Sequence, residues 1–85
     1  MSRIDEIRWL SWENAVEWGK IDCPMLGMEV MTYHRKGEPA FDTYTAPFVD
    51  ADGEVCYYKF DQDEGFWDED IFFVSEYEEG MRLRL

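Results

Sequence analysis

Residues 42–60 read DTYTAPFVDADGEVCYYKF and contain the clearest structural signal in this chain of 85 residues. Two runs rich in β-branched and aromatic residues flank Asp52-Gly53, a dipeptide typical of the tight turn of a β-hairpin. Pro47 lies in the first run and has no N–H to donate, so it suits an edge or a bulge rather than a central strand. This stretch therefore predicts two antiparallel strands joined by a tight turn.

The same alternating pattern extends to both sides of this hairpin. Upstream, residues 28–34 (MEVMTYH) place side chains alternately on two faces, as a strand does. Downstream, residues 70–77 (DIFFVSEY) and 81–85 (MRLRL) flank a turn at residues 78–80 and predict a further antiparallel pair. About four to five strands follow from these runs.

The N-terminal region shows a different pattern. Ser2 and Ser11 are suitable N-caps for two helical turns, and the second segment, residues 12–18, ends at Gly19, a residue common just after a helix. Apolar residues from Trp9 onward recur at steps of three and four, which favours a helix with one apolar face. The prediction is an α+β fold, with an N-terminal helical segment packed on an antiparallel sheet.

Composition indicates one small domain spanning residues 1–85. Six Phe, five Tyr and four Trp can provide an aromatic core, which a chain this short needs because it buries little surface. Neither a targeting segment nor an apolar run long enough to cross a membrane is present, and Cys23 and Cys56 lie in no metal-binding array. We therefore expect a cytoplasmic protein with two reduced thiols.

Charge is concentrated in one half of the chain. The net charge is −12, and residues 37–79 contain fourteen acidic residues against the single base Lys59. Acidic residues there recur at a spacing of two, which in a strand places them about 6.6–6.8 Å apart on one face. That spacing is comparable to the separation of phosphates along a nucleic-acid strand. The pattern therefore favours a surface that imitates a phosphate backbone.

The predicted partner-binding residues are the acidic residues of this region together with one aromatic anchor. They are Asp50, Asp52, Glu54, Asp61, Asp63, Glu64, Trp67, Asp68, Glu69, Asp70, Glu76, Glu78 and Glu79. Such a surface would bind a basic protein, and it would bind neither nucleic acid nor a membrane.

Small acidic inhibitors encoded by bacteriophages and other mobile elements are similar to this chain in size and charge. They include DNA mimics that act against restriction enzymes, CRISPR systems, or nucleoid and transcription proteins. No motif accompanies the similarity, so it assigns no residue roles. It implies a non-enzymatic, cofactor-free inhibitor of the anti-restriction or anti-CRISPR type, a monomer or small oligomer that acts in the host cytoplasm if it is encoded by a phage.

Two other functions remain open from the sequence. One is a structural protein that assembles through aromatic strands. The other is a calcium-binding module: EF-hand spacing fails from Asp50 and from Asp61, yet an irregular site of acidic residues between 61 and 70 would suit a hard cation. An enzyme is disfavoured because the sequence contains no catalytic motif.

Overall fold

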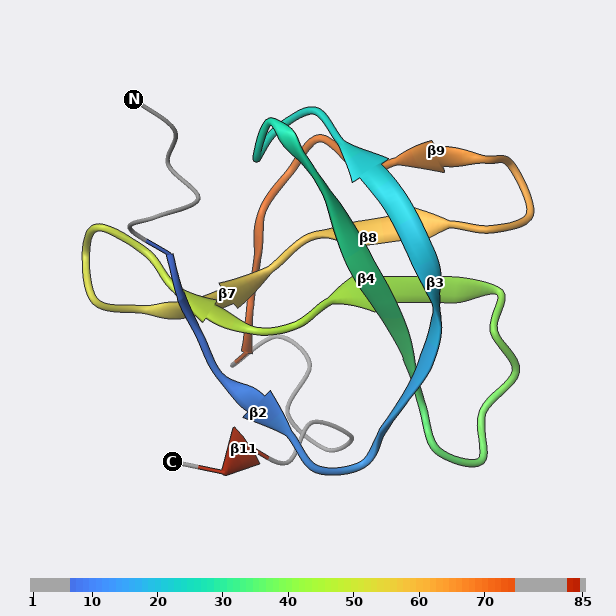
Figure 1. Cartoon of the computed structure of the whole chain (residues 1–85), viewed down its shortest axis with the longest axis horizontal. Coiled ribbons are helices and arrows are strands. Elements are labelled where there is room, and N and C mark those ends of the chain that lie inside the picture. The colour runs from blue at the N-terminus through green and yellow to red at the C-terminus, as the bar shows by residue number, and fades with distance from the viewer. Residues whose placement is uncertain (1–6, 75–82, 85) are drawn as a thin grey trace.

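The computed structural model describes residues 7–74 and the strand Leu83–Arg84, and in that part of the chain it contains short β-strands and no helix (Figure 1). The strands are β1 Arg8–Trp9, β2 Ser11–Trp12, β3 Ala15–Cys23, β4 Met28–Arg35, β5 Asp42–Thr45, β6 Phe48–Val49, β7 Val55–Tyr57, β8 Lys59–Asp61, β9 Phe66–Trp67, β10 Phe72–Phe73 and β11 Leu83–Arg84. The α+β prediction is therefore wrong, because the described chain is nearly all β. Consequently, it also has no helix that is long and apolar enough to cross a bilayer.

The larger sheet has five strands in the order β3-β4-β5-β8-β9, all antiparallel. A turn at residues 24–27 joins β3 to β4, and Gly27 adopts a positive φ of 68° there. The two edge strands of this sheet approach each other, since the Trp67 indole N–H of β9 donates to the Asp22 carbonyl of β3 at 2.6 Å. The sheet is therefore curled toward closure.

The second sheet has four strands in the order β1-β6-β7-β10. Strand β6 follows β5 after the corner at residues 46–47, and β7 is followed by β8 after Tyr58. One long bent hairpin therefore contributes strands to both sheets. The sequence prediction of a hairpin around Asp52-Gly53 is confirmed: Phe48 pairs with Cys56, and Gly53 has a φ of 81°.

The expected helix at residues 12–18 is replaced by extended chain. Trp12 ends the short strand β2, and residues from Ala15 onward pair with β4 in β3. Gly19 does not end a helix. It resumes the pairing with β4 after a β-bulge between Glu17 and Gly19, and its carbonyl accepts a hydrogen bond from the Thr32 hydroxyl at 2.6 Å. The first proposed helix cap, Ser2, lies outside the described residues.

The C-terminal strands also pair differently from the prediction. Within residues 70–77, the described strand β10 pairs with β7, so that Phe72 lies opposite Tyr57. Within residues 81–85, β11 pairs with β2 through Leu83 and Trp12. The predicted pairing of these two segments with each other is therefore wrong for their described strands.

Two apolar clusters cover the two faces of residues 56–58. Cys56 and Tyr58 belong to a core that includes Phe48 and Cys23, whereas Tyr57 packs with Trp12 on the other face. Both cysteines are buried as free thiols. Burial raises the pKa of the Cys23 thiol, so this group stays protonated at neutral pH.

Candidate functional site

The acidic residues of the described chain are divided among three turns. The 50–54 turn joins β6 to β7, the 61–65 turn joins β8 to β9, and the 68–70 turn follows β9. An aspartate opens each turn and accepts backbone N–H groups through its Oδ1 atom. Asp50 accepts from residues 52 and 54 at 2.9 Å each, and Asp61 accepts from residues 63 and 64 at 2.9 and 3.0 Å.

Asp68 does the same, since its Oδ1 accepts the N–H of Asp70 at 3.1 Å. An aspartate that bonds to the backbone N–H two residues later forms an Asx turn. At these three sites the first aspartate of each spaced pair is therefore a turn residue, and the second contributes only its backbone N–H. The prediction that these carboxylates line the face of a strand is therefore wrong for the three turns. Another pair of acidic residues at a spacing of two, Glu76 and Glu78, and the neighbouring Glu79 lie outside the described residues.

Six other carboxylates of these turns project into solvent. They are Asp52, Glu54, Asp63, Glu64, Glu69 and Asp70, and all six are exposed, whereas the three capping aspartates are half-buried. Among the described residues no ion pair involves any of the six; the ion pair found there joins Arg35 to Glu38. The turns therefore separate the predicted acidic residues into a structural set and a set that faces solvent.

The acidic turns do not form one continuous face. Figure 1 shows the 50–54 turn at one end of the long axis and the 61–65 turn at the other end. The longest dimension of the molecule is 36 Å. The 68–70 turn lies at the other end of β9 from the 61–65 turn. The structure thus brings the predicted residues together within each turn and keeps the turns apart.

Trp67, the predicted aromatic anchor, is part of the fold. Its ring is half-buried and meets Phe60 edge to face at 5.1 Å between centroids, while its indole N–H bonds to the Asp22 carbonyl. The neighbouring Phe66 is the exposed ring, with 54% of its surface accessible. Because successive residues of a strand point to opposite faces, the sequence could not tell which of the two rings faces solvent.

The calcium alternative finds no support in the described residues. There, no three side chains of Asp, Glu, His or Cys are grouped so that they could hold a metal ion. The Oδ1 atoms of Asp61 and Asp68 are already engaged with backbone N–H groups.

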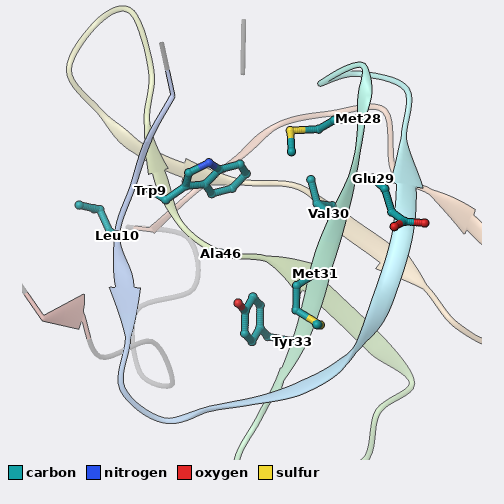
Figure 2. Close-up of a pocket in the computed structure, with 8 residues that line it drawn as sticks. All are labelled: Trp9, Leu10, Met28, Glu29, Val30, Met31, Tyr33 and Ala46. Carbon is teal, nitrogen blue, oxygen red and sulfur yellow. The ribbon is translucent and has the colours of Figure 1, made fainter. Parts of the chain in front are cut away.

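One cavity was not anticipated from the sequence. It has a volume of about 290 Å³ and lies between β4 and the Trp9–Leu10 segment (Figure 2). Met28, Val30, Met31 and Tyr33 come from β4, and Ala46 comes from the corner between β5 and β6. Burial raises the pKa of the Tyr33 hydroxyl, and the charge of Glu17 adds to this shift. The walls are mainly apolar, with Glu29 at the rim.

Comparison with protein-family models, with curated proteins and with solved structures found no match for this chain. Its function must therefore be argued from the acidic turns and the cavity.

Proposed function

We propose that this protein is a non-enzymatic acidic binding protein that occupies a basic nucleic-acid-binding surface of another protein and blocks it. The observation that supports the proposal is the set of six exposed turn carboxylates, which have no cationic partner among the described residues. The capping aspartates already form the turns. Among the described residues the side chains of these six carboxylates form no hydrogen bond or ion pair, so their charge is available to a partner.

A like-charge pair beside one turn adds to this argument. Asp42 of β5 lies directly opposite Asp61 of β8. Like charges in directly opposed positions of an antiparallel sheet are destabilising. A protein that keeps such a pair gives up stability, and sites that break a local folding rule are often functional. A cationic surface bound over the 61–65 turn would relieve this repulsion.

The separation of the turns fits an imitation of nucleic acid. The molecule is 36 Å long, and two of its three acidic turns, residues 50–54 and 61–65, lie at opposite ends (Figure 1). Proteins that contact two half-sites of DNA do so roughly 34–36 Å apart, which is one helical turn. A basic protein with two phosphate-binding patches at that spacing could engage both turns together.

The setting that we propose is the cytoplasm, where an inhibitor of the phage or mobile-element type would meet restriction, CRISPR or other DNA-binding proteins. Free thiols at both buried cysteines are compatible with a reducing compartment. The strong net charge favours a monomer or a small closed oligomer, because copies of a chain at −12 repel one another.

The test is competition between this protein and duplex DNA for one partner. The partner would be captured from a lysate of the encoding cell, identified by mass spectrometry and purified. We expect added duplex DNA to displace it, and we expect binding to weaken steeply as salt rises. A partner that binds this protein and DNA at once, with unchanged affinity for each, would refute the proposal.

Charge variants localise the effect. Asp63→Asn with Glu64→Gln removes two charges from the 61–65 turn and leaves its cap, Asp61, intact. Glu13→Gln with Glu17→Gln is the matched control, which removes two exposed charges near β3. At about 0.5–1 kcal/mol for each exposed charge pair, the turn variant should bind roughly fivefold to thirtyfold more weakly. Equal losses in the two variants would mean that only net charge matters, and not these turns.

A further inference from the structure

The outer edge of β4 has no strand partner over half its length. On one side β4 pairs with β3 from Met28 to Arg35, but on the other side β5 pairs only with Thr32 and Tyr33. After Thr45, the end of β5, the chain turns away from β4 at the corner of residues 46–47. Within the described residues, no strand pairs with the outer edge of residues 28–31.

The hydrogen bonds of β5 show which backbone groups of β4 point toward the open side. The Thr45 N–H donates to the Tyr58 carbonyl at 3.0 Å, so it points away from β4. The pair formed by Thr45 and Thr32 is therefore of the non-hydrogen-bonded type. The adjacent residue of β4, Tyr33, directs its backbone N–H and C=O toward β5. Because this direction alternates along a strand, Glu29 also directs its N–H and C=O toward the open side.

The opposite wall of the gap is another edge strand. Strand β1 is at the edge of the four-stranded sheet and pairs with β6 on one side. Figure 2 shows the Trp9–Leu10 segment and β4 on the two sides of the cavity, running in the same sense. A strand placed between them could therefore lie antiparallel to both edges.

The cavity between these edges is suited to a side chain. Its volume of about 290 Å³ lies just below the range for small-molecule sites, which runs from about 300 to 1,000 Å³. Met28 and Met31 line it, and methionine side chains adapt to differently shaped apolar groups. In strand addition, the main chain provides hydrogen bonds while pockets accept alternate side chains. The groove has both elements.

Charge indicates what kind of strand fits. Asp22 of β3 lies directly opposite Glu29 of β4, and both are exposed. Figure 2 shows the Glu29 carboxylate turned toward β3 rather than into the cavity. The cavity thus suits an apolar side chain, and the rim on the β4 side, away from Arg8 of β1, suits a cation. A second copy of this chain is a poor occupant, because each copy has a net charge of −12.

We propose that the groove between β1 and β4 binds an extended basic segment of a partner protein by strand addition. The segment bonds to the Glu29 backbone, inserts one apolar side chain into the cavity, and places Lys or Arg beside Asp22 and Glu29. The groove residues are separate from the acidic turns, so the proposal does not require that the turns imitate nucleic acid.

The probe is a short fluorescein-labelled peptide in which lysine alternates with threonine around one central leucine. Fluorescence anisotropy should show saturable binding to the wild-type protein, and amide shifts in NMR spectra should concentrate at residues 28–31 and 8–10. A peptide N-methylated on the amides that face β4 should bind at least tenfold more weakly, because it cannot donate those hydrogen bonds. No binding at about millimolar protein, or equal binding of the N-methylated peptide, would overturn the proposal.

Two variants test the cation and the cavity separately. Glu29→Lys should weaken binding at least tenfold, whereas Glu13→Lys, an equal charge reversal at an exposed site outside the groove and the acidic turns, should change it less than threefold. Ala46→Leu should narrow the cavity and reduce the preference for leucine over alanine at the centre of the peptide. Equal effects of the two charge reversals would show non-specific attraction. A dimer of the wild-type protein that Ala46→Leu abolishes would assign the groove to a second copy instead.

Discussion

Replacing Asp61 with alanine should destabilise the protein far more than replacing Asp63, although the two residues have the same charge and lie in the same turn. The Asp61 Oδ1 atom accepts two backbone N–H groups, from residues 63 and 64, at 2.9 and 3.0 Å. Asp63 is exposed and forms no described ion pair. The two alanine variants therefore remove the same charge and differ in the hydrogen bonds that are lost and in the repulsion with Asp42, which only Asp61→Ala relieves.

The magnitude follows from those two bonds. A net contribution of about 0.5–1.5 kcal/mol for each gives about 1–3 kcal/mol. Water can reach both N–H groups after the side chain is removed, so we expect a loss near the lower end of that range, about 1–1.5 kcal/mol. In a domain of this size, such a loss lowers the Tm by about 4–12 °C. Asp63→Ala should stay within about 0.5 kcal/mol of wild type.

The assay is urea unfolding followed by tryptophan fluorescence, with the Tm measured in parallel. Asp61→Asn is the informative third variant, since the amide oxygen can still accept both N–H groups while the charge is lost. It should be as stable as wild type or slightly more stable, because it also removes the repulsion with Asp42 across the β5–β8 pair. If Asp61→Asn were as unstable as Asp61→Ala, or if Asp63→Ala were equally unstable, the role of Asp61 as the cap of this turn would be incorrect.

Three other changes test the core and its pH dependence. Phe48→Ala should cost about 3–5 kcal/mol in urea unfolding, because this ring is 1% exposed; a loss below 1 kcal/mol would contradict the described packing. Trp67→Phe should cost about 0.5–1.5 kcal/mol by removing the indole hydrogen bond, and a larger loss of 3–5 kcal/mol is expected for Trp67→Ala. Burial raises the pKa of the Cys23 thiol and the Tyr33 hydroxyl, so the folded state holds these protons more tightly than the unfolded state does. Their contribution to the free energy of unfolding is therefore present below about pH 9 and is lost as pH rises and the groups ionise. Urea midpoints from pH 7 to about 10.5 should therefore fall, and a flat profile would contradict these shifts.

Local sequence patterns predicted part of the fold correctly. The alternation of residues 28–34 marked β4, and Asp52-Gly53 marked the hairpin between β6 and β7. Both signals act between neighbouring residues. The error in the N-terminal region has a physical cause: the bulge at Glu17/Gly19 interrupts the alternation of β3, and it makes a strand resemble the end of a helix.

The candidate sites depended on information that no local pattern contains. An acidic residue two positions after an aspartate is compatible with a strand face and with an Asx turn, and only the chain path distinguishes them. The groove arises because β5 leaves β4 after Thr45 while β1 arrives from far away in the sequence. Pro47 was the available clue, since a proline in a strand signals that regular pairing ends nearby.

The bent hairpin of residues 42–61 limits how the molecule can open. Residues 56–58 are covered by one apolar cluster on each face, and the flanking strands belong to different sheets. If either sheet separated from the hairpin, apolar side chains of residues 56–58 would be exposed to solvent, and the packing of the other sheet on the hairpin would weaken as well. Local opening of one sheet in this region therefore costs nearly as much free energy as unfolding the domain. Amide protons near the centre of the hairpin should exchange with solvent only when the whole domain unfolds.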